Sequence, residues 1–334
     1  MKLIIPMAGR GTRVRPHSHV TPKPLLNVRG KSMVERIVQT FMDVLPRPLT
    51  EAVFILGPDF PKSVYEDLTS ICDQFGIKAD FAVQESAEGT AHAVYSAKDH
   101  LSGEGVVVFA DTLFYMDGNL DLDADAIVWV KHVEDPSRFG VAVREGDRVT
   151  AFVEKPKELI SNEALIGIYY MRDLAEFGSK IVELVEGNER GNTGEFQLTD
   201  ALDKMLKDGA LFKTAGVTDW LDCGTIPALL DTTKVILEME RGGVHAGVVE
   251  DSILIEPVYI GPEAQVRGSV VGPNVSIEAG AIVEGSVVRE SIVFANGRVE
   301  GSVLDESLVG QYATVRGMTG PINVGDHSEL GTRD

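Results

Sequence analysis

Hydrophobic and polar positions divide the chain into two parts with different periods. Up to about residue 240, short apolar runs alternate with stretches in which apolar residues recur every three or four positions. This alternation is typical of a mostly parallel sheet flanked by helices. It predicts strands at Leu3–Pro6, Ala52–Leu56, Asp80–Val83, Val106–Ala110, Ala126–Val130, Gly140–Val143, Val149–Val153 and Leu165–Tyr170.

Two further patterns refine this α/β prediction. Residues 33–45 place Met33, Phe41 and their apolar neighbours on one helical face, which predicts an amphipathic helix. Residues 144–148, with Gly146 at their centre, have the composition of a hairpin turn, so one antiparallel element is expected in the sheet. The predicted fold is a modified doubly wound, Rossmann-like sheet, which binds ligands at the carboxyl ends of its strands.

The period changes after residue 241. Ser252, Ser269 and Ser286 recur at a spacing of 17 residues, and aliphatic residues between them step by five or six. These aliphatic positions are Ile260, Val266, Val271, Ile277, Val283, Val288, Val293, Val299, Leu304, Val309 and Val315. Three such steps per coil predict a left-handed parallel β-helix of the hexapeptide type, whereas a β-sandwich would need longer strands of period two. The chain is therefore predicted to have two domains, residues 1–241 and 242–334.

Composition narrows the class of partner. The chain has 31 Lys and Arg against 51 Asp and Glu, a formal charge of -20 that disfavours nucleic acid and anionic lipid. Its two cysteines, Cys72 and Cys223, lack metal-ligand spacing, which suits a reducing cytoplasm. Apolar runs are too short for a signal peptide or a membrane span. We expect a soluble, cytoplasmic protein that acts on small molecules.

One basic, glycine-containing loop stands out on this acidic chain. It follows the first predicted strand, and Gly9 and Gly11 allow backbone N–H groups to approach anionic oxygens closely. The positive charge comes from Arg10, Arg13, Arg15 and Lys23. The loop is therefore predicted to hold phosphate groups.

Two common phosphate-binding motifs do not fit this loop. A dinucleotide fingerprint needs a third glycine where Val14 stands. A Walker A loop ending at Gly30-Lys31-Ser32 needs a glycine where Leu25 stands. Neither motif therefore accounts for the predicted phosphate contacts of this loop.

The run from Ala8 to Arg13, with Pro16 and the downstream Pro22-Lys23-Pro24-Leu25, resembles the signature of sugar-1-phosphate nucleotidylyltransferases, also called nucleoside-diphosphate-sugar pyrophosphorylases. The resemblance is greatest to glucose-1-phosphate thymidylyl- and uridylyltransferases with a C-terminal β-helix, although Pro6-Met7 replaces the commoner Leu-Ala. It implies transfer of a nucleoside monophosphate from dTTP or UTP to a hexose 1-phosphate, most commonly glucose 1-phosphate, in a Mg²⁺-assisted in-line displacement.

The resemblance also implies roles at the phosphates. Arg13 would neutralise the departing pyrophosphate, and Lys23 would brace the α-phosphate, both by electrostatic stabilisation. Asp111 and Asp222 would hold Mg²⁺. The remaining nucleotide contacts would come from Ala8, Gly9, Gly11 and Thr12.

Base and sugar sites follow from the same resemblance. Gln84 would recognise the base, because its amide complements N3–H and O4 of a pyrimidine, although a turned amide would suit cytosine. Gly89 would admit the base edge, and Thr90, assigned to the same nucleotide site, also has the features of a helix N-cap. The sugar phosphate would be bound by Gly140, Glu154, Lys155 and Gly167.

Two alternatives remain beside this transfer. Left-handed β-helices also occur in acyltransferases, but from residue 246 onward the only histidine is His327 and no lysine occurs, so a general base is scarce. A catalytically silent, nucleotide-sugar-sensing subunit would be expected to lack Arg13, Lys23 or the two aspartates, and all are present. The β-helix is expected to mediate homo-oligomerisation or regulation.

Overall fold

The computed structural model describes residues 1–9, 11–116, 118, 120–191, 194–241 and 246–331, and Arg10 lies outside these ranges. The chain divides into two compact units. The first comprises Met1–Gly9, Ile37–Ala110 and Phe114–Trp220, and the second comprises Arg10–Arg36, Asp111–Leu113 and Leu221–Asp334. The predicted domain boundary between residues 241 and 242 stays a prediction, because residues 242–245 are not among those described.

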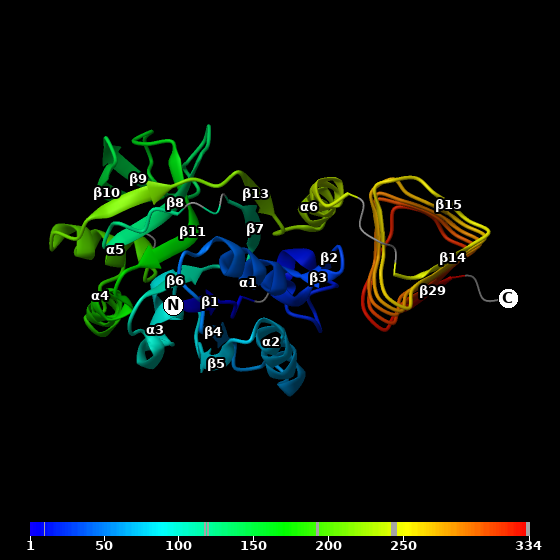
Figure 1. Cartoon of the computed structure of the whole chain (residues 1–334), viewed down its shortest axis with the longest axis horizontal. Coiled ribbons are helices and arrows are strands. Elements are labelled where there is room, and N and C mark those ends of the chain that lie inside the picture. The colour runs from blue at the N-terminus through cyan, green and yellow to red at the C-terminus, as the bar shows by residue number, and fades with distance from the viewer. Residues whose placement is uncertain (10, 117, 119, 192–193, 242–245, 332–334) are drawn as a thin grey trace. The chain divides into compact units, whose positions relative to one another are not determined.

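A nine-stranded sheet forms the framework of the first unit (Figure 1). Its strands are β1 (Lys2–Pro6), β4 (Glu51–Leu56), β5 (Lys78–Val83), β6 (Gly105–Val108), β8 (Ala126–His132), β9 (Gly140–Glu145), β10 (Arg148–Glu154), β11 (Glu163–Met171) and β12 (Phe212–Ala215). Seven follow the order β10-β9-β11-β6-β1-β4-β5, and β8 pairs with β11 and β12. The strands β6, β1, β4 and β5 run parallel, whereas β11 is antiparallel to β6.

This topology confirms the predicted doubly wound fold with an antiparallel insertion. Every strand predicted for this part of the chain is present, with ends that differ by at most two residues. The hairpin between β9 and β10 turns at Gly146, which has a φ of 61°. Strand β12 was not predicted, because its four residues Phe-Lys-Thr-Ala alternate too briefly to stand out.

Helices bury the apolar faces of this sheet. They are α1 (Met33–Val44), α2 (Lys62–Phe75), α3 (Thr90–Tyr95), the 3-10 helix η3 (Lys98–His100), α4 (Leu174–Glu186) and α5 (Leu198–Lys207). Phe177 and Ile181 of α4 and Leu202 of α5 are fully buried in one core with Val107 of β6. Burial of side chains of this size stabilises the fold by about 1.5–3 kcal/mol each. None of the helices within the described residues could cross a lipid bilayer.

The second unit begins with short elements and one helix. They are the 3-10 helices η1 (Thr12–Val14) and η2 (Lys23–Leu25), the hairpin strands β2 (Asn27–Val28) and β3 (Lys31–Ser32), and α6 (Ile226–Met239). The Thr225 hydroxyl caps α6 by accepting a hydrogen bond from Ala228 N at 3.3 Å, and Pro227 lies in its first turn. The chain passes between the units through β7 (Thr112–Tyr115) and β13 (Asp219–Asp222).

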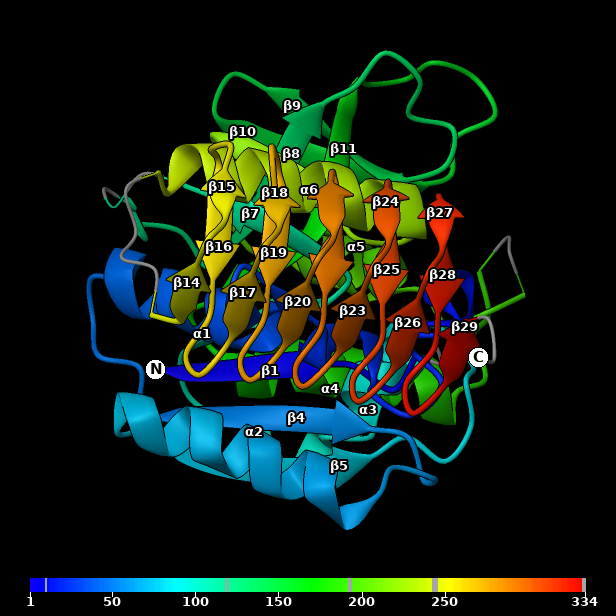
Figure 2. The ribbon, with the colours of Figure 1, turned by 90° about the vertical axis from the view of Figure 1, so that its right-hand side faces the viewer.

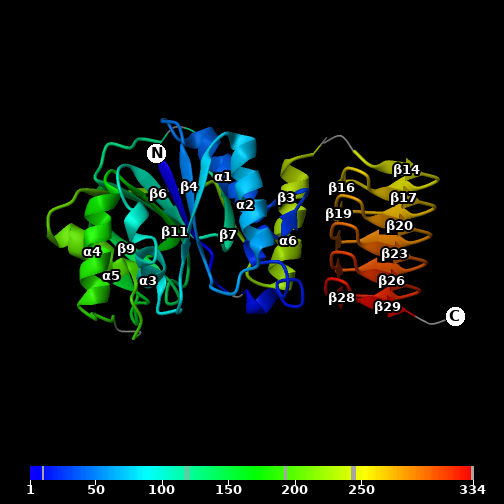
Figure 3. The same cartoon turned by 90° about the horizontal axis from the view of Figure 1, so that it is seen from below.

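The rest of the second unit is the predicted left-handed parallel β-helix, with a triangular cross-section (Figure 1) and regularly stacked coils (Figures 2 and 3). Its three sheets run in the orders β14-β17-β20-β23-β26-β29, β15-β18-β21-β24-β27 and β16-β19-β22-β25-β28. The strands are β14 (Val248–Glu250), β15 (Ile253–Leu254), β16 (Val258–Ile260), β17 (Gln265–Arg267), β18 (Val270–Val271), β19 (Val275–Ile277), β20 (Ile282–Glu284), β21 (Val287–Arg289), β22 (Ile292–Val293), β23 (Arg298–Glu300), β24 (Val303–Asp305), β25 (Leu308–Val309), β26 (Thr314–Arg316), β27 (Thr319–Gly320), β28 (Asn323–Val324) and β29 (Glu329–Gly331).

The structure explains both parts of the repeat. All the aliphatic residues predicted to point inward form one continuous core. The repeated serines satisfy backbone groups between coils: the Ser269 hydroxyl donates to Arg267 O at 2.7 Å and accepts from Ser286 N at 3.0 Å. Ser286 repeats this pattern with Ser302 N at 3.1 Å. A buried hydroxyl therefore recurs because it pairs corner amides that would otherwise lack a partner.

Candidate active site

The loop and hairpin over residues 11–32, here called the signature segment, fold around Gly11. Gly11 has a φ of 55°, in the left-handed region. A Cβ on Gly11 would lie 2.9 Å from the Cβ of Lys23 and 3.3 Å from the Cβ of Ser18. The Ser18 hydroxyl donates to Gly11 O at 2.6 Å. Glycine is thus required here both for the backbone conformation and for the close approach of Lys23.

Lys23 is a buried lysine, with 7 % of its surface exposed. Its Nζ donates to the backbone oxygen of Asp111 at 2.7 Å. Burial lowers the pKa of the Lys23 ammonium, and nearby Arg13 adds to this, while Asp111, Cys223 and Asp222 act in the opposite direction. Because a buried ammonium is costly, a phosphate oxygen placed beside it would be bound favourably.

Arg13 and Asp222 meet at Gly224. A Cβ on Gly224 would lie 2.8 Å from Asp222 Oδ1 and 3.3 Å from Arg13 Nη2. Gly224 N donates to the same carboxylate oxygen at 2.7 Å, and the Thr232 hydroxyl donates to Asp222 O at 2.7 Å. The glycine after Cys223 therefore leaves room for both charged side chains. The second unit thus brings together Arg13, Lys23, Asp111 and Asp222, here called the Lys23 cluster.

The two aspartates of this cluster fit a divalent cation. Both are exposed, and both lie close enough to Lys23 to affect its pKa. Carboxylate oxygens are the ligands that Mg²⁺ prefers, and Mg²⁺ usually takes one or two of them together with water and phosphate oxygens. Two carboxylates open to solvent provide that donor set.

In the first unit, Gln84 lies just after β5 and is buried. Its Nε2 is 3.3 Å from His92 Nδ1, so the amide donates to the imidazole when Nε2 of the ring carries the proton. The His92 ring stacks near Phe196, with centroids 6.3 Å apart. The histidine is thus a packing residue that also orients the Gln84 amide.

Gly89 and Thr90 lie at the start of α3 and contact the segment before α5. Gly89 has a φ of 121°, and a Cβ on it would lie 2.4 Å from Phe196 O, so its lack of a side chain accommodates this backbone. The N-cap prediction for Thr90 is wrong, because Thr90 is the first residue of α3 and Gly89 is the cap. The Thr90 hydroxyl instead accepts a hydrogen bond from Leu198 N at 2.9 Å, at the start of α5.

The predicted sugar-phosphate residues Gly140, Glu154 and Lys155 come together on the β9–β10 hairpin, where Gly140 pairs with Glu154. A Cβ on Gly140 would lie 2.9 Å from Glu154 Oε2, and the Thr199 hydroxyl donates to that oxygen at 3.0 Å. Lys155 is exposed, with a φ of 44° and its Nζ 3.8 Å from Glu154 Oε1. The hairpin thus presents one carboxylate and one ammonium side by side.

Asp200 was not predicted as a site residue. Burial raises the pKa of Asp200, and the carboxylate of Glu154 raises it further, so the two groups are neighbours. The sequence places Asp200 on a helix, and only the folded chain brings that helix against β10. Gly167, the fourth predicted sugar-phosphate residue, lies at a bulge of β11 with a φ of 80°, and its carbonyl accepts from Phe109 N at 3.0 Å.

The other predicted nucleotide contacts lie in the two units as follows. Ala8 and Gly9 follow β1 in the first unit, and a Cβ on Gly9 would meet no atom within 4 Å. Thr12 is exposed at the start of η1 in the second unit. The open surroundings of Gly9 and Thr12 are compatible with ligand contact, which stays a prediction for both.

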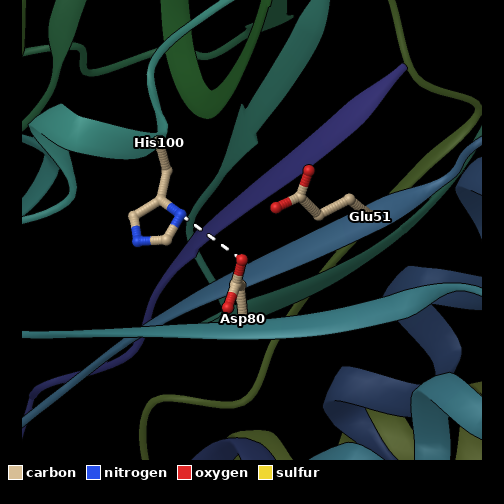
Figure 4. Close-up of side chains that lie close together, drawn as sticks. All are labelled: Glu51, Asp80 and His100. Atoms are coloured by element: carbon tan, nitrogen blue, oxygen red, sulfur yellow. Dashed lines mark ion pairs between the residues drawn. The ribbon is translucent and has the colours of Figure 1, made fainter.

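A second group of potential metal ligands lies elsewhere in the first unit (Figure 4). One ligand atom from each of Glu51, Asp80 and His100 lies within 4.8 Å of the others. Lys78 Nζ is 2.5 Å from Asp80 Oδ2 and 3.8 Å from Glu51 Oε1, and Lys2 Nζ is 3.7 Å from Glu51 Oε2. Because lysines already neutralise both carboxylates at the amino ends of β4 and β5, we interpret the group as an ion-pair network.

Comparisons with known proteins identify the family. The profile of the family described as nucleotidyl transferase matches residues 2–239. The low-salt glycan biosynthesis nucleotidyltransferase Agl11 of Haloferax volcanii is 29% identical, with 90% of each chain covered. A glucose-1-phosphate thymidylyltransferase of Streptomyces antibioticus is 28% identical over 86% of this chain and 81% of its own. The bifunctional protein GlmU of Methanocaldococcus jannaschii is 30% identical over 77% of this chain and 59% of its own.

A solved structure shows the same fold. UDP-glucose pyrophosphorylase complexed with UDP-glucose superimposes with a TM-score of 0.59 at 21% identity, covering 72% of this chain and 99% of that one. At this level of identity the match supports the architecture alone.

Proposed function

Because the chain belongs to the nucleotidyl transferase family and is a sugar-1-phosphate nucleotidyltransferase, we propose that it transfers a nucleoside monophosphate from dTTP or UTP to glucose 1-phosphate. The observation that carries this proposal is the Lys23 cluster, in which a buried ammonium and a guanidinium adjoin two exposed carboxylates. A relative named for glucose-1-phosphate thymidylyl transfer supports these substrates.

The reaction is a single in-line displacement. A phosphate oxygen of the sugar phosphate attacks the α-phosphorus of the triphosphate and forms a new P–O bond. The bond between the α-phosphorus and its bridging oxygen breaks, and pyrophosphate leaves with that electron pair. Lys23 braces the α-phosphate and Arg13 neutralises the pyrophosphate, so the protein contributes positioning and charge.

Asp111 and Asp222 are the residues that would hold Mg²⁺. When bound, the ion neutralises the facing charges of the α-phosphate and the sugar phosphate. The two carboxylates would also orient Lys23 and Arg13, because both cationic side chains lie beside them.

No covalent intermediate is expected. Cys223 is the thiol next to the Lys23 cluster, and burial raises its pKa to about 12. The thiol therefore stays protonated at neutral pH and is a poor nucleophile. Mass spectrometry of the enzyme mixed with triphosphate alone should show only the unmodified chain, and a nucleotidyl adduct would contradict the displacement.

Base and sugar recognition are assigned to the first unit. Gln84, with its amide oriented by His92, would pair with the pyrimidine edge, and Gly89 and Thr90 would shape that site. Glu154 would accept hydrogen bonds from sugar hydroxyls, and Lys155 would neutralise the sugar phosphate. Gly140 keeps the space beside Glu154 open.

The substrates are tested by a panel. Each common nucleoside triphosphate is combined with glucose 1-phosphate, then with other hexose 1-phosphates, and pyrophosphate release is measured with Mg²⁺. We expect the highest kcat/KM with dTTP or UTP. Gln84→Ala should lower the preference for these nucleotides over CTP by about tenfold, because a lost hydrogen-bonding pair changes discrimination by about 1–3 kcal/mol. Highest activity with a purine triphosphate would refute the base assignment.

The β-helix is proposed to join copies of this chain. Ile253, Val270, Val287 and Val303 align on the outer face of the sheet β15-β18-β21-β24-β27. Ile253 is 62 % exposed and Val303 43 %. An apolar, flat column of this kind suits a second copy of the same surface. Val303→Glu should lower the assembly state measured by sedimentation velocity, and an unchanged state would contradict the interface.

Acyl transfer is not proposed. His327 is the only histidine after residue 246, and its ring stacks on Tyr312 with 5.1 Å between centroids. We also propose a cytoplasmic location, because Cys72 and Cys223 are buried free thiols, as is usual in a reducing compartment.

A further inference from the structure

One corner of the β-helix carries an unusual column of residues. Gly261, Glu278, Phe294, Gly310 and Gly325 occupy equivalent positions on successive coils, because each backbone N–H of the first four donates to the residue before its counterpart on the next coil. Three of the five are glycines. The two that carry side chains, Glu278 and Phe294, are only 1 % and 2 % exposed. We call this set the corner column.

Glu278 is a buried carboxylate whose partners come mainly from the signature segment. Its Oε2 accepts from Asn27 Nδ2 at 3.1 Å and its Oε1 from Gly30 N at 3.1 Å. A third hydrogen bond comes from the neighbouring Ser276 hydroxyl at 2.7 Å. Two of the three donors therefore belong to the β2–β3 hairpin. Removing the Glu278 carboxylate while the hairpin stays docked would leave both hairpin donors without this partner, which is costly.

The hairpin fits the same surface sterically. A Cβ on Gly30 would lie 2.2 Å from the hydroxyl oxygen of Tyr259, which lies on the same sheet as Ser276. The Arg29 guanidinium is 5.6 Å from the centre of the Tyr259 ring. The turn of the hairpin therefore presses its backbone and one cation against the β-helix.

The start of the signature segment contacts the corner column farther along. The ring of His17 lies 5.4 Å from the ring of Phe294, and its Nε2 is hydrogen-bonded to Asn323 Oδ1. A Cβ on Gly325 would lie 2.8 Å from the Cβ of Pro16. The side chains and glycines of the corner column thus match the shape of the segment at two separate places.

Lys23 lies between these two anchors along the sequence. Pro16 and His17 lie before Lys23, and Asn27 and Gly30 lie after it. The short helix η2 that carries Lys23 is therefore fixed at both ends, which suits a buried side chain that must meet a phosphate at a defined place.

We propose that Glu278 is a positioning residue for nucleotidyl transfer, because it holds the signature segment on the β-helix and thereby fixes Lys23. The inference rests on the proposed function, in which Lys23 braces the α-phosphate. It assigns the β-helix a direct structural part in the active site, in addition to joining copies of the chain. Asn323 makes the weaker, second anchor.

The test compares Glu278→Ala with Glu278→Gln in the full chain, and uses Glu306→Gln, an exposed corner glutamate of the same β-helix, as the control. We expect E278A to lower kcat by about 10- to 100-fold, with the KM for sugar phosphate changed less than twofold. E278Q should recover most of the rate, because its amide keeps one acceptor at nearly the same volume. E306Q should match the parent.

Hydrogen exchange measures docking without relying on activity. In E278A, amide exchange should rise in residues 16–32 while the inner strands of the β-helix keep their protection. A parental kcat in E278A, or a lowered kcat with unchanged exchange in residues 16–32, would overturn the proposal. Faster exchange throughout the coils would also overturn it, since that would mark a general structural role.

The proposal can still be tested if E278A does not fold or if the parent chain is inactive. If E278A does not fold, Asn323→Ala removes an exposed anchor side chain, and it should raise exchange around His17 and lower kcat two- to fivefold; no change in either would contradict the proposal. If the parent chain shows no transfer with any substrate, the proposed function fails, whereas the exchange result still decides whether Glu278 holds the segment.

Discussion

Two clusters in this protein contain a lysine beside carboxylates, but the pKa values of the two lysines shift in opposite directions. In the Lys23 cluster, burial lowers the pKa of Lys23 despite two aspartates nearby. In the group of Lys78, Glu51, Asp80 and His100, here called the strand-start cluster, the hydrogen bond to Asp80 raises the pKa of Lys78. Burial in the fold disfavours the charged form of Lys23. The charged form of Lys78, which is exposed to solvent, is instead stabilised by Asp80. A disfavoured charge indicates a ligand site better than a count of ionisable groups does.

The largest effect should come from the carboxylates of the Lys23 cluster. The double substitution Asp111→Asn and Asp222→Asn should lower kcat by at least about 10³-fold, because it removes both anionic ligands from the proposed Mg²⁺ site. Pyrophosphate release at saturating substrates measures the effect, and removing divalent ions from the parent with EDTA should give the same loss.

The strand-start cluster supplies the matched control. Glu51→Gln with Asp80→Asn also removes two carboxylates, but from the group that lysines neutralise, and it should leave kcat within twofold of the parent. If this pair abolished activity while the Asp111 and Asp222 pair remained active, the two clusters would have been assigned the wrong way round.

The next effect concerns the lysines themselves. Lys23→Ala should lower kcat by about 10²–10³-fold, the usual cost of removing a donor that stabilises transition-state charge. Its melting temperature should not fall, because the ammonium is buried without favourable hydration. Lys78→Ala should change neither quantity appreciably. A K23A rate within fivefold of the parent, measured on folded protein, would show that burial of this lysine is unrelated to catalysis.

Much of this contrast could be predicted from the sequence. The strands, the hairpin at Gly146 and the β-helix follow from local periodicity, because a sheet face or a prism core imposes its spacing on the chain. Arg13 and Lys23 belong to a short motif, and Asp111 follows a buried strand. These residues could be selected because each lies within or beside a recognisable local pattern.

Residues whose role depends on distant contacts could not be predicted. Asp200 neighbours Glu154 only through the packing of α5 on β10. Thr90 has the local features of a cap, yet its hydroxyl is used by the start of α5. Glu278 stands in a repeat as one more polar corner residue, and its burial depends on the hairpin of residues 27–32. No local spacing encodes such pairings.

A smaller effect should distinguish the two glycines of the loop. Gly11→Ala places a Cβ 2.9 Å from Lys23 Cβ at a φ of 55°, and it should cost about 1–3 kcal/mol of unfolding free energy and lower kcat about tenfold. Gly9→Ala meets no atom within 4 Å, so its unfolding free energy should match the parent. Its KM for the triphosphate should rise if the Gly9 backbone approaches the phosphates. Equal stability of the two variants would contradict the account of Gly11.

The smallest effect should come from Asp80→Asn in the strand-start cluster. Surface ion pairs contribute little, so the variant should keep parental kcat and melt within about 2 °C of the parent at neutral pH. The hydrogen bond from Lys78 lowers the pKa of Asp80, so any stabilisation is present above the ordinary aspartate pKa and is lost as pH falls through the lowered value. The difference in melting temperature between parent and variant should therefore disappear in acid. A large neutral-pH loss that 1 M salt does not reduce would show that this cluster is more than a screened ion-pair network.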